Sequence, residues 1–386
     1  MTATADGAAP LRVLIAGGGI AGTEAALALH HSAGDGVAIE LLTPGSDLVD
    51  RPGSVRAPFA DFDLPRLPLE SIAAFAGVTV HRGSLAAVDV GRRQAATRDG
   101  TRLAYDRLIV AVGAHAADSV AGAVHFRGPL TVGALEATVR AAARDPDAQL
   151  TFALPSRVSW PLPLYEIALL AAADLSARGV IDPRVCIVTH EQRPLELLGA
   201  TGSEATARLL DRAGVEVVTG ADPRATFDGV LQSAAGALLE AGRVVTLPAL
   251  AGRPVDGLPH DADGFLPIDE DGRVPGAPDV FAVGDASDRA IKQGGLAAQQ
   301  ADAVAAQIAA EVGAPIEGFA PVPLLRALFA TPDGPLYIRM ALDGAHHATL
   351  SPTPLWDPPT KVAARFLSGF FAGRPGAQLV EPSPVA

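Results

Sequence analysis

The 386-residue sequence contains a single cysteine, Cys186. One cysteine excludes an intrachain disulfide, a zinc site built from cysteines and a redox relay between two thiols. The chain carries a formal net charge of −13 and has no block of basic residues, which argues against nucleic-acid binding because phosphate contacts need clustered Lys and Arg. We therefore expect neither a metal site nor a nucleic-acid partner.

The sequence also has no segment that would direct it into or across a membrane. Residues 1–10 have neither a basic start nor an apolar core, so we expect a disordered tail there and no signal peptide. No uncharged apolar run is long enough to span a bilayer. These features predict a cytoplasmic protein. Because 49% of the residues are hydrophobic and 19% are charged, the chain can bury a large core, and its length predicts two or three domains.

A glycine-rich turn near the N-terminus is the strongest positive signal. An apolar run of strand type enters it and an Ala/Leu-rich helical pattern leaves it, which is the order that binding of a dinucleotide pyrophosphate requires. Gly17 permits the tight turn, Gly19 lets backbone N–H groups approach the phosphates, and Gly22 lets helix and strand pack closely. Ile20 and Ala21 complete the expected cofactor-binding segment. A plain strand-to-helix connection is the alternative.

The second strand is expected over Val37–Leu42. Its end is where a dinucleotide-binding fold usually places an acid for the adenosine ribose, and here Thr43 stands at that position. Thr43 can hydrogen-bond a ribose hydroxyl or simply end the strand. Arg51 follows in a turn, where it would either meet the pyrophosphate or remain solvated.

A later apolar strand, Val280–Val283, ends in Gly284 and Asp285. Asp285 at the end of a strand, beside a glycine, can hold a ribityl hydroxyl of a flavin. The segment from Lys292 to Gly295 then begins a long helix, whose N-terminus offers N–H groups and a positive dipole to the pyrimidine edge of a flavin. A strand-helix crossover without a ligand is the alternative.

The glycine turn, Tyr105–Ala114 and Asp279–Ala286, in this order and spacing, resemble the two-dinucleotide-domain flavoproteins, the superfamily of pyridine nucleotide–disulfide oxidoreductases. In that resemblance Gly113 belongs to the second segment that contacts the cofactor. Pro155–Glu166 and Lys292–Ala301 resemble most the branch of sulfide:quinone reductases, flavocytochrome c sulfide dehydrogenases and type II NADH dehydrogenases. The similarity implies bound FAD, with its isoalloxazine ring at the interface of two domains.

The resemblance also implies a fold class and a division into domains. The fold is expected to be α/β, with two Rossmann-like three-layer domains and a C-terminal cap. Residues 11–114 and 247–318 would form a discontinuous FAD-binding domain, and residues 115–246 an inserted NAD(P)-type domain. Residues 319–386 would form the cap or interface domain.

The inserted domain has an unusual turn after its first strand. The turn, Pro155–Pro163, contains three prolines and no glycine, so it cannot approach a pyrophosphate as the first turn does, and nicotinamide binding there is doubtful. Glu191, after the expected strand Val185–Thr189, is where a nicotinamide ribose would be held. Surface capping or solvation of Glu191 is the competing interpretation.

Departures from the relatives bear on the chemistry. Trp160 stands where the sulfide-oxidising relatives have a cysteine, and Cys186 lies inside an expected strand, where we interpret it as a small buried apolar residue. Thiol chemistry is therefore excluded. Glu166 matches an acid of the NADH-oxidising relatives, in the first turn of a helix starting near Leu164, and is the candidate catalytic residue. A purely structural role at the helix start is the alternative.

The segment Lys361–Phe371 is predicted to be an amphipathic helix. In quinone-reducing relatives such a helix lies on the membrane surface, which would place this protein at the inner face of the membrane. Packing on its own core or on a partner subunit of a homodimer is the interpretation we favour, because the patch is short and the protein is acidic.

These observations together predict an FAD-dependent oxidoreductase that moves two electrons from a donor, NAD(P)H, to a quinone-like acceptor. The flavin would carry the redox chemistry while the protein supplies position and electrostatics. One alternative is a flavin oxidoreductase with a non-nicotinamide small-molecule or sulfur donor. Another is a flavin-binding redox module without turnover.

Overall fold

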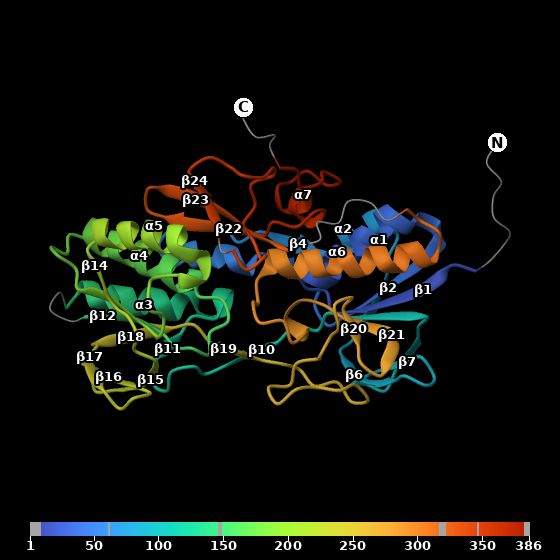
Figure 1. Cartoon of the computed structure of the whole chain (residues 1–386), viewed down its shortest axis with the longest axis horizontal. Coiled ribbons are helices and arrows are strands. Elements are labelled where there is room, and N and C mark those ends of the chain that lie inside the picture. Colours follow the sequence, from blue (N-terminus) through green and yellow to red (C-terminus); the bar gives the residue numbers. More distant parts are fainter. Residues whose placement is uncertain (1–8, 61, 146–148, 316–321, 346, 382–386) are drawn as a thin grey trace.

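A computed structural model describes residues 9–60, 62–145, 149–315, 322–345 and 347–381. Most of the tail expected over residues 1–10, and part of the expected cap, lie outside these ranges. The described chain forms an elongated molecule with one parallel sheet toward each end (Figure 1). Among the described residues, no helix is both long enough and apolar enough to cross a membrane.

The first parallel sheet receives the N-terminal strand. Its order is β20-β21-β9-β1-β2-β5, and all neighbours are parallel except β20 and β21. Its strands are β1 (Leu11–Ala16), β2 (Val37–Thr43), β5 (Thr79–Arg82), β9 (Arg107–Val110), β20 (Arg273–Val274) and β21 (Ala277–Ala282). Since β9 and β21 are neighbours in space but far apart in sequence, two separate chain segments build this sheet.

Side chains that alternate along β1 enter two different cores. Val13 and Ile15 pack in the core beneath three helices, whereas Leu14 and Ala16 pack in the core on the other face, as the pleat of a strand requires. The helices are α1 (Ile20–Ala33), α2 (Leu69–Ala76) and α6 (Gly294–Glu311). The other face carries an antiparallel sheet of β6 (Leu85–Asp89), β7 (Gln94–Thr97) and β8 (Arg102–Ala104). The unit therefore has three layers.

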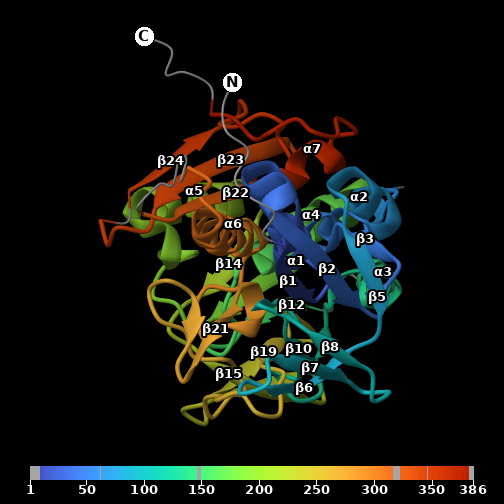
Figure 2. The same cartoon turned by 90° about the vertical axis from the view of Figure 1, so that its right-hand side faces the viewer.

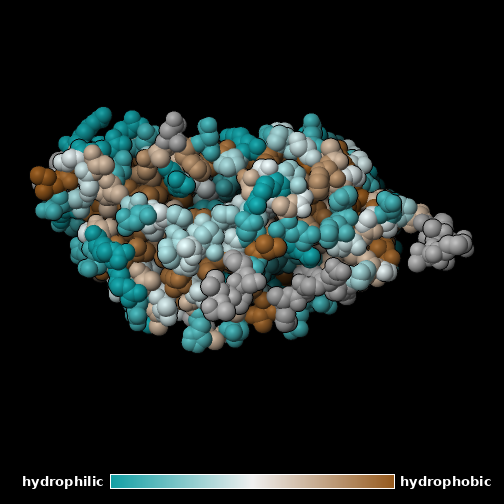
Figure 3. Space-filling view, turned by 90° about the horizontal axis from the view of Figure 1, so that it is seen from above, coloured by the Kyte–Doolittle hydropathy of each residue, from teal (hydrophilic) through white to brown (hydrophobic). Residues whose placement is uncertain are grey.

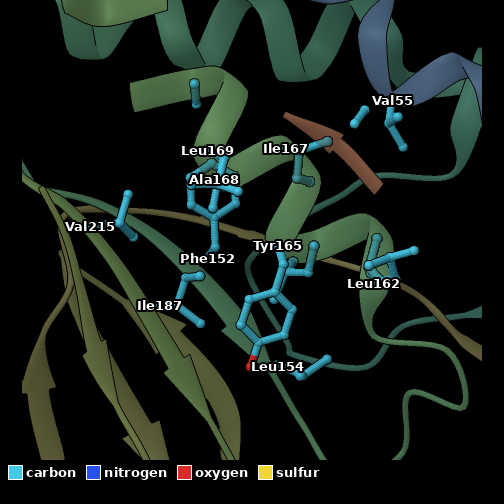
Figure 4. Packing of buried hydrophobic residues seen from close by; sticks show 14 of the residues in the cluster. Val55, Phe152, Leu154, Leu162, Tyr165, Ile167, Ala168, Leu169, Ile187 and Val215 are labelled. Atoms are coloured by element: carbon cyan, nitrogen blue, oxygen red, sulfur yellow. The ribbon is translucent and has the colours of Figure 1, made fainter. Parts of the chain in front are cut away.

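The second parallel sheet has the order β11-β18-β12-β13-β14. Its strands are β11 (Val124–His125), β12 (Leu150–Leu154), β13 (Val185–Thr189), β14 (Val215–Val218) and β18 (Arg243–Thr246). Its helices, which share one core, are α3 (Val132–Ala143), α4 (Leu162–Ala177) and α5 (Gly199–Arg212). In that core Phe152 and Ile187 of the sheet lie beside Tyr165 and Leu169 of α4 (Figure 4).

The opposite face of the second sheet is covered by antiparallel strands. These are β15 (Pro223–Phe227), β16 (Val230–Ser233) and β17 (Leu238–Glu240). The chain enters this half through β10 (His115–Ala117) and leaves it through β19 (Ala249–Ala251), and these two strands pair antiparallel to each other. The predicted α/β fold is confirmed, and both parallel sheets have a helical face and an antiparallel-sheet face.

A third sheet and a C-terminal segment cover the helical side of both halves (Figures 1 and 2). Its antiparallel strands are β22 (Leu324–Thr331), β23 (Gly334–Ala341) and β24 (Ala348–Ser351). Strand β22 contacts both α4 and α6. The sheet therefore bridges the helical layers of the two halves.

The helix expected over Lys361–Phe371 is shorter than predicted. Only Leu367–Phe371 is helical (α7), and Val362 and Ala364 before it are buried in a segment of bends and turns. Their apolar side chains join the core shared with α1 and α6, so this segment packs on its own protein. On the face of Figure 3, hydrophobic residues are interspersed with hydrophilic ones.

Candidate functional site

The glycine-rich turn connects β1 to α1 with no room for side chains at two positions. Gly17 has a φ of +124°, and a Cβ there would lie 2.1 Å from the carbonyl oxygen of Ala111. A Cβ on Gly22 would lie 1.8 Å from the carbonyl oxygen of Gly17. These contacts let α1 start directly above the ends of β1 and β9.

Gly19 differs from these two glycines because it faces open space. A Cβ on Gly19 would have nothing within 4 Å, and α1 has no side-chain cap at this end. Its first N–H groups, including those of Ile20 and Ala21, belong to the donors that a helix leaves unpaired. The turn therefore fits a pyrophosphate, which needs close backbone approach and exposed donors at a helix N-terminus.

The residues expected at the adenosine end lie beside this turn. Thr43 is 3% exposed, and its hydroxyl accepts a hydrogen bond from the N–H of Gly45 at 3.3 Å. A Cβ on Gly18 would lie 2.7 Å from that hydroxyl oxygen. The exposed Arg51 begins a partly buried 3₁₀ turn, and its charge acts on Asp285, so the structure brings these two expected cofactor residues together.

Asp285 lies in the half-buried turn after β21. Burial raises the pKa of its carboxyl, and the charges of Lys292 and Arg51 oppose that rise. Gly284, with a φ of +66°, packs between Ala21 of α1 and Ala297 of α6. A half-buried carboxylate beside two cations, at the point where α1 and α6 begin, fits the role of holding hydroxyl groups of a flavin chain.

Lys292 and the start of α6 form the next part of the site. The Lys292 ammonium donates to the carbonyl of Ser287 and lies 3.8 Å from the ring centre of Phe265. Burial lowers the pKa of Lys292, and Asp285 opposes this shift most strongly. At the helix itself the side chain of Gln293 accepts a hydrogen bond from the N–H of Leu296.

The irregular segment before α7 lies against the glycines at the start of α6. A Cβ on Gly294 would lie 3.1 Å from Ile20 and 3.6 Å from Val362. A Cβ on Gly295 would lie 3.2 Å from the carbonyl oxygen of Ala363. The segment therefore borders the region where the flavin ring is expected.

Glu166 lies in the second turn of α4, since the helix begins at Leu162, and not in the first turn as expected. Its side chain is fully buried. One oxygen, Oε1, accepts from the N–H of Ala330 at 2.6 Å and from the ammonium of Lys361, whereas Oε2 has no partner among the described residues. Burial raises the pKa of Glu166, and the charge of Lys361 opposes the rise.

Lys361 is a site residue that our sequence reasoning did not find. Its ammonium also donates to the carbonyl of Leu328 at 3.0 Å, and its charge acts on the half-buried Asp50. The chain contains only two lysines, Lys292 and Lys361. Both lysines lie beside the start of α6. The small number of lysines is therefore the one feature of the sequence that could have pointed to Lys361.

Glu191 is buried, 3% exposed, so the surface interpretation of this residue is wrong. Its Oε2 accepts hydrogen bonds from the hydroxyls of Tyr165 and Thr189, and Oε1 accepts from the N–H of Glu196 at 3.2 Å. In Figure 4 the Tyr165 hydroxyl lies at the edge of the drawn cluster, beside Leu154. Both oxygens are thus occupied by the protein itself.

The remaining site expectations concern the thiol, the turn residues and metals. Cys186 is 3% exposed in β13, as predicted, and burial raises its pKa to about 12. Gly113 lies after β9 with a φ of +67° and nothing within 4 Å of a built Cβ. In the described part of the chain, no group of three or more His, Cys, Asp or Glu side chains could hold a metal ion.

A family model described as pyridine nucleotide-disulphide oxidoreductase matches residues 166–301. Two NADH dehydrogenase-like proteins, from the CDC 1551 / Oshkosh and H37Rv strains of Mycobacterium tuberculosis, are 29% and 28% identical to this chain. The matches run over 303 and 302 residues and cover 71% of this chain and 72% of each relative.

Solved structures with the same fold have lower sequence identity. The sulfide:quinone oxidoreductase of Aquifex aeolicus has a TM-score of 0.78 at 15% identity, covering 88% of this chain and 86% of that chain. A ferredoxin reductase of Rhodopseudomonas palustris has a TM-score of 0.65 at 18% identity, covering 86% and 83%. An NAD-dependent persulfide reductase of A. fulgidus has a TM-score of 0.62 at 18% identity, covering 86% and 64%.

Proposed function

We propose that this chain, which the pyridine nucleotide-disulphide oxidoreductase family model matches over residues 166–301, is a flavoprotein that transfers two electrons from NAD(P)H to a quinone-like acceptor. FAD, when bound, would supply the two-electron chemistry. The glycine turn with Gly19, together with Thr43, Arg51 and Asp285, would hold the cofactor. Lys292 and the start of α6 at Gly295 would adjoin its ring.

The buried pair of Glu166 and Lys361 is the observation that carries the choice of acceptor. Reduction of a quinone by two electrons takes up two protons, so its site needs groups that hold and deliver protons. The Lys361 ammonium is a proton donor, and the unpartnered Oε2 of Glu166 can accept a proton. Glu166 is fully buried and Lys361 is only 12% exposed, next to Val362 at the start of α6, so the two groups would act where little water reaches them.

The nicotinamide donor rests on separate support. The relatives in Mycobacterium tuberculosis are named NADH dehydrogenase-like, and Glu191 lies two residues after the end of β13, where a nicotinamide ribose would be held. Binding through Glu191 would require its carboxylate to exchange a protein partner, such as the Tyr165 hydroxyl, for the ribose.

Anaerobic rapid mixing tests the two half-reactions separately. We expect NADH or NADPH to bleach the flavin absorbance of the purified holoprotein, and a soluble quinone to restore it. Glu166→Gln should slow one or both steps on the order of ten- to a thousandfold, since one positioned acid or base contributes about a hundredfold, while FAD content stays unchanged. Glu204→Gln, an exposed acid on α5, is the matched control. Wild-type rates in Glu166→Gln at all pH values would show that Glu166 has only a structural role.

A donor other than nicotinamide is the second candidate. The glycine-free turn Pro155–Pro163 and the occupied carboxylate of Glu191 both favour it. In that case neither NADH nor NADPH would bleach the flavin, whereas a small organic or sulfur donor would. Bleaching by dithionite alone would instead favour a redox module without turnover.

A further inference from the structure

Two buried carboxyl groups lie side by side between the main helices of the first half. Glu24 on α1 is fully buried and Asp302 on α6 is 8% exposed. Each carboxyl acts on the pKa of the other, and a hydrogen bond between two carboxyl groups requires a proton on one of them. Two adjacent negative charges in a buried site would repel each other strongly. Their burial and mutual repulsion therefore favour a pair that holds one proton.

The backbone donors around the pair decide where that proton lies. Glu24 accepts at Oε1 from the N–H of Phe366 and at Oε2 from the N–H of Leu367, both at 2.8 Å. A carboxylate that accepts several backbone N–H groups is stabilised in its ionised form. Asp302, in contrast, leaves its Oδ1 without a partner in the described part of the chain. Glu24 is thus the ionised member, and Asp302 carries the proton and donates it to Glu24.

Few other charges face this pair. Arg365, on the segment before α7, favours the ionised form of Asp302, and its N–H is a further donor to Glu24. His31, further along α1, lies against the ring of Phe366. Burial raises the pKa of both carboxyls, that of Glu24 to about 7, which agrees with one shared proton.

The N–H groups that Glu24 binds belong to the same short segment as Lys361. We call residues 361–367 the C-terminal strap. At one end of the strap Lys361 bonds to Glu166, in the middle Val362 packs at Gly294, and at the other end Phe366 and Leu367 bond to Glu24. The strap has no helical structure before Leu367, so these contacts fix its path.

We propose that Glu24 is a positioning residue: its carboxylate, next to a protonated Asp302, anchors the C-terminal strap and so holds Lys361 against Glu166. Only the effect on turnover rests on the proposed function, because the anchoring itself is a property of the chain. Loss of the anchor would free the strap at one end and expose the Lys361 ammonium.

Amine labelling of the holoprotein tests the anchor directly, because Lys292 and Lys361 are the only lysines. At pH 8, Glu24→Gln should raise the labelling rate of Lys361 by about tenfold or more, since loss of charge-assisted hydrogen bonds favours local opening. Lys292 is the internal control and should react at its wild-type rate. Mass spectrometry reads both sites. A Lys361 rate equal to wild type in folded, FAD-loaded Glu24→Gln would overturn the proposal.

Asp302→Asn tests the proton and does not depend on how well Glu24→Gln folds. The folded pair keeps a proton that the two unfolded carboxyls lose above their ordinary pKa, so wild-type stability should fall as pH rises from 6 to 9. The asparagine amide can donate to Glu24 and does not titrate. This variant should therefore keep Lys361 protected from amine labelling, and its Tm should fall less than that of the wild type between pH 6 and 9. An unchanged Tm slope in Asp302→Asn would contradict the assigned proton.

The two proposals can fail separately. Slow labelling of Lys361 that depends on Glu24, in a protein that no nicotinamide reduces, would leave the anchor standing and remove the proposed donor. Normal turnover in Glu24→Gln with rapid labelling of Lys361 would show that strap position does not control the reaction.

Discussion

Lys361 and Glu166, 195 positions apart in the chain, form a buried ion pair between the C-terminal strap and α4. The Lys361 side chain is 12% exposed and that of Glu166 is fully buried. Neither residue has an oppositely charged neighbour in sequence that would mark the pair. Their contact joins the second half of the molecule to the segment that borders the start of α6.

Removal of Lys361 alone should be costly. Lys361→Met leaves the Glu166 carboxylate buried without its cation, which we expect to destabilise the fold by about 3–5 kcal/mol. The pKa of Glu166 is already raised by burial, so the loss should be smallest below the ordinary pKa of a Glu and should grow as pH rises through the raised value. Chemical unfolding at several pH values measures this.

The double variant Glu166→Gln/Lys361→Met separates stability from chemistry. Replacing both members of a buried pair by neutral groups often changes stability little. The double variant should therefore recover most of the stability that Lys361→Met loses. Quinone reduction should remain slow, because the proton-holding groups are gone. Recovery of both stability and turnover would contradict the proposed role.

Gly19→Ala should weaken FAD binding without harming the fold. The added methyl group meets nothing within 4 Å in the protein, but it would stand where backbone N–H groups approach the phosphates. Gly133→Ala, in the first turn of α3 and equally free of neighbours, is the matched control. FAD titration of the apoproteins and their Tm values provide the readout, and equal FAD affinity in both variants would refute the assigned phosphate site.

Asp285→Ala should release much of the FAD while the fold persists. The carboxylate is half-buried beside Lys292 and Arg51. Its removal takes away an acceptor for the hydroxyls of the flavin chain and leaves these two cations without their negative partner. The exposed Asp271→Ala serves as the control. A measured FAD content equal to wild type in Asp285→Ala would remove this residue from the site.

Cys186→Ser should leave turnover nearly unchanged and lower the free energy of unfolding by about 1–3 kcal/mol, because a buried hydroxyl without a partner is unfavourable. The thiol, with its pKa raised to about 12, should not react with a thiol reagent in the folded protein at pH 7–9. Labelling before and after denaturation checks this. Rapid labelling of the folded protein would place the thiol at the surface.

Local sequence patterns predicted the elements that carry the expected cofactor site. Strand β13 spans Val185–Thr189 as expected, and α6 begins at Gly294, within the predicted segment. Burial of Cys186 followed from its place in an apolar strand. These predictions succeeded because strand periodicity, helix propensity and glycine in tight turns act over a few residues.

Some local patterns were misleading. The spacing of apolar residues over Lys361–Phe371 suggested one helix, but the strap is irregular before Leu367, and its Val362 and Ala364 pack in the core shared with α1 and α6. Tertiary packing overrides helix propensity in so short a segment. Glu191 looked solvated from its place after a strand, yet Tyr165 and Thr189 bind it inside the protein.

Neighbouring residues in the chain were enough to predict individual strands such as β13, the glycine turn at Gly17–Gly22 and the turn that carries Asp285. The partners of the buried charges depend instead on the tertiary structure: Lys361 for Glu166, and Asp302 with the strap N–H groups for Glu24. A buried charge must find a compensating group. Which group does so is fixed by the folding of distant segments onto one another, and no local pattern records it.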